Sequence, residues 1–343
     1  MITYSVAKMT NLKTKLTWKL GIFIILITIS CADNANPKSN PQSDEVLSNV
    51  TNELSGNSIT TPLAAISLIS TDISVGSNRL AFALINTDTN TLIKSEHVNM
   101  KLSKVDANNL KTLDESIDTY PRLVEIDRGY SHLHDDGSTH FHNAGSIGVY
   151  ISQIMLPAKG RWLIEISIME EALRLTTNPT VIQVRENSLS PAIGSDAPQS
   201  EQLLLEQVDH ISEIDTSSPP DPDMHKISVA EAIDNSLPTV IVFASPGFCA
   251  SLTCGTTKIL VDDLHQQYKE SANFIHIEPY DLHKARTNQG LVPIDIMNDW
   301  GLRSEPWVFF IDHQGKISSK FEGVVTKREL ASAFERLNHN LVK

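Results

Sequence analysis

Two of the chain's three cysteines have the spacing and setting that thiol chemistry needs. Four residues separate Cys249 from Cys254, and the pair follows the continuously apolar run Thr239–Ala244, which predicts a buried strand. After them, Thr256–Glu270 has apolar residues at helical spacing. A cysteine in a loop before a helix has its thiolate stabilised by the helix dipole. A second cysteine nearby can resolve a mixed disulfide, so the pair predicts thiol–disulfide exchange.

The spacing of the pair limits the local backbone. On one continuous α-helix, Cα atoms five residues apart would be too distant to bridge without backbone movement. We therefore expect residues 249–254 to form a loop, with the helix beginning near Thr256, after Gly255. A stabilising disulfide on a redox-inactive scaffold is the alternative interpretation of the same pair.

Four of the twelve histidines fall inside one short segment. They flank the turn residues 135–139 and are His132, His134, His140 and His142. If His134 pairs with His140 across a hairpin, His132 opposes His142, and all four imidazoles share one face. Copper and zinc are the ions that such a face would bind, with Asp135 or Asp136 as weaker candidate ligands. The alternatives are a solvated hairpin tip or a sensor of acidity.

The elements that position these residues divide into two predicted folded units. Residues 61–186 contain short apolar runs with turn signals between them, which predict a β-sandwich. The expected strands include Arg79–Asn86, Val98–Leu102, Gly148–Leu156, Arg161–Ile168 and Thr180–Val184. Residues 187–226 are rich in proline and serine and predict an interdomain linker.

The second unit, residues 227–343, is predicted to have the order β-α-β-α-β-β-α after a short first helix. Capping-box patterns at Ser228–Glu231 and Thr326–Glu329 open its first and last helices. Its remaining elements are expected at Thr239–Ala244, Thr256–Glu270, Phe274–Ile277, Pro293–Trp300, Trp307–Asp312 and Ile317–Phe321.

The third cysteine, Cys31, is explained by targeting. Four lysines precede the apolar run Leu20–Ile29, which is followed by small residues, as in a secretory signal. Thr28-Ile29-Ser30-Cys31 resembles a bacterial lipobox, which implies residues 1–31 as a signal peptide and a lipid anchor on Cys31. Ordinary cleavage after Ala32 is the alternative. Residues 32–60 predict a flexible tether, so we expect an extracytoplasmic protein held at a membrane.

The motifs of the second unit resemble the thioredoxin-like superfamily. They are Phe248-Cys249, Cys254-Gly255 and, later in the chain, Glu305-Pro306-Trp307-Val308. The resemblance implies an α/β thioredoxin-like domain in which Cys249 attacks, Cys254 resolves and a cis Pro306 shapes the substrate groove. Similar motifs occur in a group of thioredoxin-like lipoproteins. The Gly160-Arg161-Trp162 stretch of the first unit resembles the small Ig-like sandwiches of extracytoplasmic copper-handling proteins.

Two positions depart from the thioredoxin pattern. Phe243 stands where many thioredoxins bury an acid, and Glu305 is an acidic residue before the expected cis-proline. A carboxylate at Glu305 would raise a thiol pKa, accept a proton or complete a metal site. We expect His276 to be a packed strand histidine. His283 could approach the cysteines, but the Cys-x₄-Cys spacing differs from that of copper chaperones in the superfamily.

The net charge of the chain limits the kinds of partner that it can bind. The chain has 343 residues and a formal charge of −13, which argues against nucleic-acid binding, because a phosphate backbone needs a basic surface. We therefore expect a thiol–disulfide oxidoreductase that needs no cofactor and acts on protein thiols or disulfides. A copper-binding or metal-delivery protein and a redox-inactive binding module are the alternatives.

Overall fold

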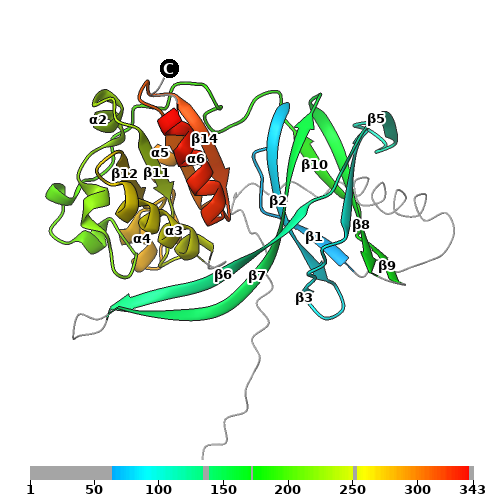
Figure 1. The fold of residues 1–343 in the computed structure, drawn as a ribbon, viewed down its shortest axis with the longest axis horizontal. Helices are drawn as coiled ribbons and strands as arrows, with labels where there is room; N and C mark the ends of the chain where they lie inside the picture. Colours follow the sequence, from blue (N-terminus) through cyan, green and yellow to red (C-terminus); the bar gives the residue numbers. More distant parts are fainter. Residues whose placement is uncertain (1–63, 134–138, 171–172, 250–252, 340–343) are drawn as a thin grey trace, which may run out of the picture. The chain divides into compact units, whose positions relative to one another are not determined.

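The computed structural model describes residues 64–133, 139–170, 173–249 and 253–339 (Figure 1). All of these residues belong to one unit, Val50–Lys343. The predicted signal peptide, the tether and Cys31 lie outside the described residues. Within the described ranges, no helix is long and apolar enough to span a membrane.

Two antiparallel β-sheets form the first region (Figure 1). One sheet has the order β1-β2-β7-β6 with β3 on β2, and the other has the order β10-β8-β4-β5 with β9 on β8. The strands are β1 Ala64–Leu68, β2 Gly76–Asn86, β3 Thr91–Leu92, β4 Val98–Val105, β5 Thr112–Thr119, β6 Arg122–Leu133, β7 Thr139–Leu156, β8 Gly160–Glu170, β9 Leu173–Thr176 and β10 Thr180–Val184. The strands expected from the apolar runs are confirmed.

Apolar residues at alternate positions of the strands form the core between these sheets. On β2, Leu80, Phe82 and Leu84 are fully buried in one cluster with Met100 of β4 and Trp162 of β8. Alternate residues of a strand point to one face. Side chains from both sheets therefore share one hydrophobic core.

The hairpin of β6 and β7 has a different register from the one we expected. His132 is opposite His140, and Tyr130 is opposite His142. The register shifts between Asp127 and Gly129, and a shift of this kind moves every pair beyond it. Pairing at the tip is thus set by the apolar body of the hairpin and the irregularity within it, neither of which the histidine spacing reveals.

The second region is a mixed α/β arrangement around a four-stranded sheet of order β12-β11-β13-β14. β11 pairs parallel with β12 and antiparallel with β13, and β13 pairs antiparallel with β14. The strands are β11 Thr239–Phe243, β12 Asn273–Ile277, β13 Trp307–Ile311 and β14 Ile317–Glu322. The helices are α2 Val229–Asp234, α3 Thr253–Tyr268, α4 Leu282–Arg286, α5 Asp295–Asp299 and α6 Lys327–His339.

Both faces of β11 are covered, which explains its unbroken apolar sequence. Val240 and Val242 pack in a cluster with residues of α3 and α6. Ile241 and Phe243 pack in a second cluster with Trp300 and residues of α2 and α5. A strand buried on both faces needs apolar residues at every position. The predicted element order is confirmed, with α4 as an additional short helix.

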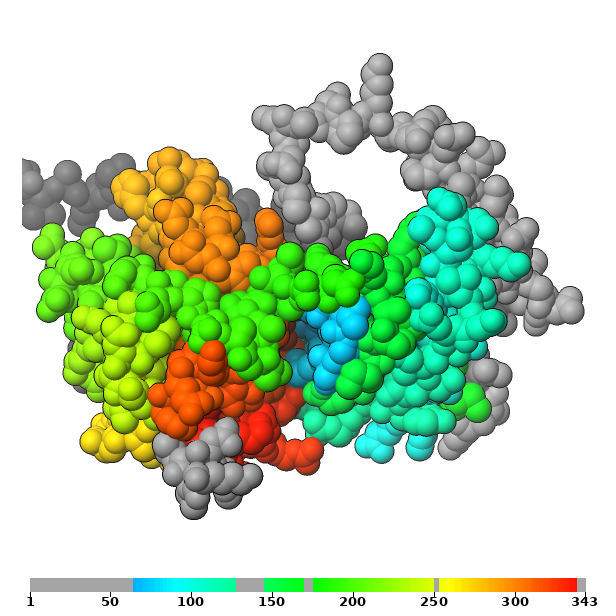
Figure 2. Space-filling model, turned by 90° about the horizontal axis from the view of Figure 1, so that it is seen from above, coloured from blue at the N-terminus to red at the C-terminus, as the bar shows by residue number. Residues whose placement is uncertain are grey.

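The segment predicted as a linker contains three short 3₁₀ helices, η1 Leu205–Gln207, η2 Ile211–Glu213 and η3 Pro222–His225. In Figure 2 this green segment lies across the surface of the α/β region. It also reaches inward, because Asp215, Met224 and His225 are buried. The segment is therefore packed against the second region rather than only joining two regions.

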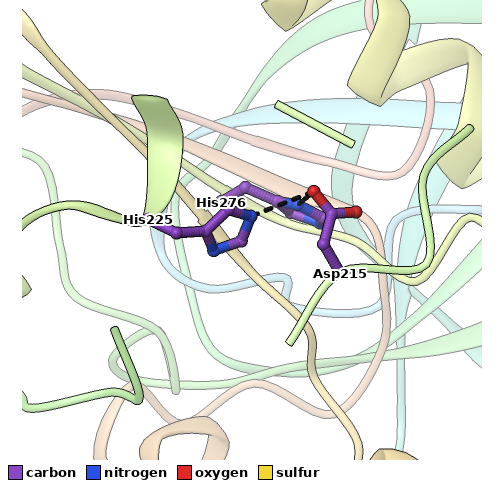
Figure 3. Close-up of side chains that lie close together, drawn as sticks. All are labelled: Asp215, His225 and His276. Carbon is purple, nitrogen blue, oxygen red and sulfur yellow. Dashed lines mark hydrogen bonds and ion pairs between the residues drawn. The ribbon is translucent and has the colours of Figure 1, made fainter. Parts of the chain in front are cut away.

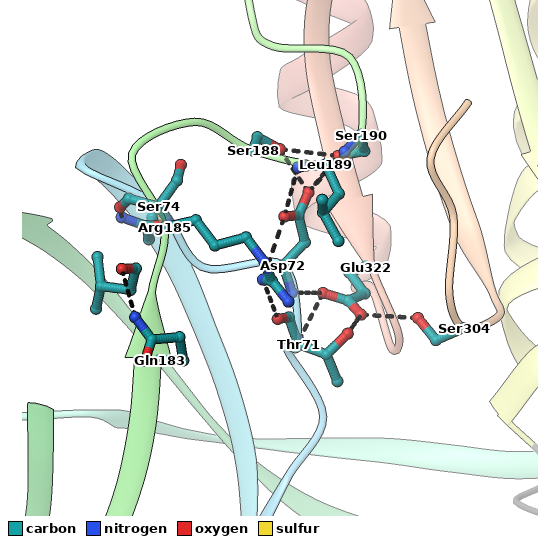
Figure 4. A network of polar contacts seen from close by, with 12 residues as sticks. Thr71, Asp72, Ser74, Gln183, Arg185, Ser188, Leu189, Ser190, Ser304 and Glu322 are labelled. Carbon is teal, nitrogen blue, oxygen red and sulfur yellow. Dashed lines mark hydrogen bonds and ion pairs between the residues drawn. The ribbon is translucent and has the colours of Figure 1, made fainter. Parts of the chain in front are cut away.

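A buried carboxylate connects the two regions through hydrogen bonds (Figure 4). Glu322, at the end of β14, accepts hydrogen bonds from the backbone N–H groups of Thr71 and Asp72. The hydroxyl groups of Thr71 and Ser304 also donate to this carboxylate. Nearby, Arg79 of β2 forms an ion pair with Glu329 of α6. These contacts satisfy charged groups that burial would otherwise penalise.

We expect Gly301→Ala to destabilise the fold. Gly301 has a φ of +62°, and an added Cβ would overlap the carbonyl oxygen of Leu189. The left-handed backbone alone costs roughly 1–2 kcal/mol for an L side chain, and the overlap adds to that cost. Denaturant unfolding would show a larger loss than in Gly290→Ala, where φ is +92° and no atom lies near the added Cβ. Equal losses in the two variants would contradict this expectation.

Candidate functional site

Cys249 and Cys254 form a disulfide, with their Cα atoms 6.0 Å apart. Cys249 precedes α3 and is partly exposed, whereas Cys254 lies in the first turn of α3 and is fully buried. The Sγ of Cys249 accepts a hydrogen bond from the backbone N–H of Cys254 at 3.4 Å. The expectation that Cys249 lies outside the helix is confirmed. The expected helix start near Thr256 is wrong, because α3 begins at Thr253, and Gly255 is tolerated in its first turn.

A carboxyl group and a cis-proline lie beside the disulfide. Glu305 and Pro306 are joined by a cis peptide bond immediately before β13, as the resemblance to thioredoxins implied for Pro306. A carboxylate oxygen of Glu305 and the two cysteine sulfurs all lie within 4.8 Å of one another. The two cysteines and Glu305, which the sequence singled out, are therefore brought together.

Burial changes the acidity of Glu305. Its Oε2 accepts a hydrogen bond from the backbone N–H of Ser245 at 2.6 Å, and Tyr280 donates to the same carboxyl. Burial raises the pKa of Glu305 to about 7, because it outweighs the hydrogen bond from Ser245, and the nearby charge of Glu278 adds to the rise. A carboxyl with a pKa in this range can both donate and accept a proton near neutral pH.

A second buried acid anchors the loop that carries Cys249. Glu278, which follows β12, accepts hydrogen bonds from the backbone N–H and the hydroxyl of Thr216. The Thr216 hydroxyl in turn accepts from the backbone N–H of Gly247 at 2.9 Å. A Cβ on Gly247 would come within 2.8 Å of the Thr216 side chain. The loop that leads to Cys249 is thus held by contacts that require glycine at position 247.

A pocket of about 680 Å³ opens beside this loop. Pro246 and Gly247 line it together with Lys258 and Ile259 of α3 and the segment Thr216–Asp221. The pocket therefore adjoins the segment that leads into the disulfide.

A second group of residues with metal-ligand side chains, Asp215, His225 and His276, is fully buried (Figure 3). Asp215 follows η2, His225 ends η3 and His276 lies in β12. The Oδ2 atom of Asp215 is 3.0 Å from Nε2 of His225 and 3.3 Å from Nδ1 of His276. The nitrogen and oxygen atoms of the three residues lie within 4.8 Å of one another, so this group could hold a metal ion.

Mutual charge interactions set the proton affinities in this group. Burial alone would raise the pKa of Asp215, but the charge of His276 and the hydrogen bond from His225 hold that pKa below its usual range. Burial would lower the pKa of His276, yet the charge of Asp215 raises it overall. The pKa of His225 is lowered, chiefly by burial. In this group the Asp215 carboxylate is thus faced by both imidazoles.

Sequence reasoning missed Asp215 and His225 as functional candidates. Both lie in the segment predicted as a linker, and 50 residues separate His225 from His276, so no local spacing joins them. The expectation of a packed His276 is confirmed by its burial. His283 lies in α4 and lines the same pocket as His276, but neither metal-capable group found among the described residues includes it.

The predicted hairpin metal site is not tested by the structure. His134 lies outside the described residues, and His132, His140 and His142 are placed only by their strand register. Copper or zinc binding at these four histidines remains a prediction from the sequence.

Comparisons with known proteins give no functional assignment. No protein-family model matches the chain, and no curated protein matches it. Among solved structures, it is similar to Spo0M, a sporulation control protein from Bacillus subtilis, at 9% identity with a TM-score of 0.18. The match covers 38% of this chain and 51% of that one, so the chain spans about half the length of Spo0M. A likeness this distant supports no inference about activity.

Proposed function

We propose that the protein is a thiol–disulfide oxidoreductase whose redox pair is Cys249 and Cys254. The observation that carries the proposal is the disulfide itself, with a partly exposed Cys249 before α3 and a buried Cys254 in its first turn. An accessible thiol at a helix N-terminus is suited to attack, because its thiolate form is stabilised there. A buried neighbour is protected from external thiols and is suited to resolve the intermediate.

The surroundings support a thioredoxin-like domain. The sheet order β12-β11-β13-β14, the helices on both faces of β11 and the cis Glu305–Pro306 bond agree with the superfamily that the sequence motifs resemble. We place this domain after an Ig-like β-sandwich. The activity is argued from the site and not from the fold, because one fold serves many functions.

The proposed reaction transfers two electrons from the reduced pair to a substrate disulfide. The Cys249 thiolate attacks one substrate sulfur, forms a mixed disulfide and releases a substrate thiolate, which takes a proton from solvent. Cys254 then loses its proton to the Glu305 carboxylate and attacks Sγ of Cys249. This step forms the Cys249–Cys254 disulfide and expels the second substrate thiolate. Glu305 returns its proton to solvent, and the opposite direction retraces the same steps.

A redox titration tests this proposal. The purified chain is equilibrated in glutathione buffers of graded potential, and the fraction of free Cys249 and Cys254 is measured by alkylation and mass spectrometry. We expect a reversible two-electron transition between about −120 and −270 mV, the range of known exchange proteins. A pair that stays oxidised well below about −300 mV would behave as a structural disulfide and would contradict the proposal.

The proposed setting is extracytoplasmic. The lipobox-like segment ending at Cys31 and the polar residues 32–60 favour export and a lipid tether. In that compartment disulfides persist, and the partners would be exported proteins carrying thiols or disulfides. Labelled fatty acid incorporated in wild-type chain but not in Cys31→Ala would support the tether.

Metal delivery is a second candidate, favoured by the donor set around the cysteines. When the disulfide is reduced, two sulfurs and the Glu305 carboxylate would stand within ligand distance of one ion. Thiolates select copper(I) and zinc. Copper or zinc protection of both reduced cysteines from alkylation would favour delivery. Unchanged alkylation rates would leave thiol exchange as the function.

A further inference from the structure

We propose that Asp215, His225 and His276 form a binding site for a zinc-class divalent ion, separate from the cysteine pair. The inference does not depend on thiol exchange, because it rests only on the geometry and burial of these three side chains. Two imidazoles and one carboxylate are a donor set that zinc uses in proteins.

The separations between the donor atoms fit a shared ion. Adjacent ligand atoms of a tetrahedral zinc lie about 3.4 Å apart when each bond is about 2.1 Å long. Here Oδ2 of Asp215 lies 3.0 Å from one imidazole nitrogen and 3.3 Å from the other. Both separations are thus within a few tenths of an ångström of the tetrahedral value, and the two imidazole nitrogens lie within 4.8 Å of each other.

The second ring nitrogen of His276 points into the group. Its Nε2 lies 2.9 Å from the carbonyl oxygen of Ala244, and a carbonyl can only accept, so Nε2 carries the hydrogen. The other ring nitrogen, Nδ1, is buried and makes no aligned hydrogen bond among the described residues. Nδ1 faces Oδ2 of Asp215 at 3.3 Å, and a buried polar atom without an aligned hydrogen bond is costly. An ion bound between Nδ1 and Asp215 would remove that cost.

The residues around the group resemble the outer shell of a metal site. Metal-bound histidines usually donate their second N–H to a carbonyl or carboxylate, as His276 does to Ala244. The carboxylate is oriented as well, because Oδ1 of Asp215 accepts from the backbone N–H of Ser217 at 2.6 Å. The buried ammonium of Lys258 is paired with Asp262, which offsets its repulsion of a cation. Two of the three candidate ligands, His276 and Asp215, are thus fixed in direction.

The site also has access to a cavity. His225 and His276 line a pocket of about 610 Å³ together with Glu278, Tyr280 and His283. A zinc ion held by three protein ligands keeps one coordination position for water or another small ligand. Because two of the three candidate ligands line this pocket, it offers the ion a route of entry.

Zinc titration of the oxidised chain tests the proposal. The intact disulfide keeps the thiolates from acting as ligands, and competition with a chromogenic chelator measures affinity. We expect the wild-type chain to bind one zinc ion. Asp215→Asn and His276→Gln should each lower the affinity for that ion by more than about 10- to 100-fold, the loss that changes in the outer shell cause. The matched control is His265→Gln, which removes another buried histidine. His265 pairs with Asp221 at 2.8 Å and lies outside both three-ligand groups found in the described residues.

A second measurement uses the native chain, so it does not depend on the folding of any variant. In the native chain, long-range nitrogen–proton spectra report each imidazole nitrogen. Added zinc is expected to shift Nδ1 of His276 and Nε2 of His225 while Nε2 of His276 keeps its hydrogen. Unchanged signals, or equal zinc affinity in Asp215→Asn and wild type, would overturn the site and leave an Asp215–His276 ion pair. If zinc binds only through the histidines at 132–142, a His132→Ala/His140→Ala variant will lose the ion. That result would also overturn the proposed site.

Discussion

Cys249→Ser is expected to abolish exchange with substrate disulfides, whereas Cys254→Ser traps the substrate on Cys249 as a stable mixed disulfide. The asymmetry follows from exposure, because only Cys249 is accessible to a macromolecular disulfide. Without Cys254, no internal thiol can displace the substrate. Non-reducing electrophoresis and mass spectrometry with a model disulfide substrate would measure both outcomes.

A matched control distinguishes chemistry from damage to the helix. Thr253→Ser changes the neighbouring first residue of α3 but leaves both thiols, and we expect it to exchange at the wild-type rate. If both cysteine variants trapped substrate equally, the assignment of attacking and resolving thiols would be wrong. If the wild-type chain exchanged no faster than a free thiol, the disulfide would be structural.

Glu305→Gln is expected to slow the resolving step by about 100-fold, the lower range for loss of a positioned acid–base group. It should also remove an inflection in the rate near pH 7. The cause is the carboxyl beside the two sulfurs, whose pKa burial raises to about 7. Stopped-flow measurement of mixed-disulfide resolution from pH 5 to 9 would test this. Glu305→Asp keeps a carboxyl and should retain a pH-dependent rate.

The same substitution should raise stability at alkaline pH. A free glutamate ionises near pH 4.5, while Glu305 in the folded chain stays protonated until about pH 7. Between these values the unfolded state loses its proton first, so the wild-type fold loses stability as pH rises and then levels off. Glu305→Gln has no such loss. If Glu305→Gln is slower in exchange but more stable, the Glu305 carboxyl serves the chemistry at the expense of stability. If the variant is less stable than wild type at every pH, the carboxyl has a structural role.

Local sequence signals predicted most of the second region, because its elements depend on patterns within single segments. Ser228 caps α2 through Glu231 as the capping box indicated, and the apolar run at β11 lies between two helix layers. The start of α3 was misjudged because Gly255 suggested a break. A single glycine in a first turn costs only about 1 kcal/mol, which packing of the helix outweighs.

Long-range contacts explain what the sequence did not reveal. Glu305 is more than 50 residues from Cys249 and was identified only through its place before Pro306. Asp215 and His225 offered no comparable pattern, because each reaches His276 only after the segment 187–226 packs onto the sheet. The hairpin register was also missed, because the irregularity between Asp127 and Gly129 changes the pairing and is not visible in the spacing of the histidines.

The hydrogen bonds that join Glu278, Thr216 and Gly247 have a thermodynamic consequence. Thr216 directly follows Asp215, and Gly247 lies two residues before Cys249, so one short chain of contacts spans from the buried histidines to the disulfide. Any influence that passes along it must be reciprocal. If an ion at Asp215 moved the midpoint potential of the cysteines by 30 mV, reduction of the cysteines would change the ion's binding by about 1.4 kcal/mol, or tenfold.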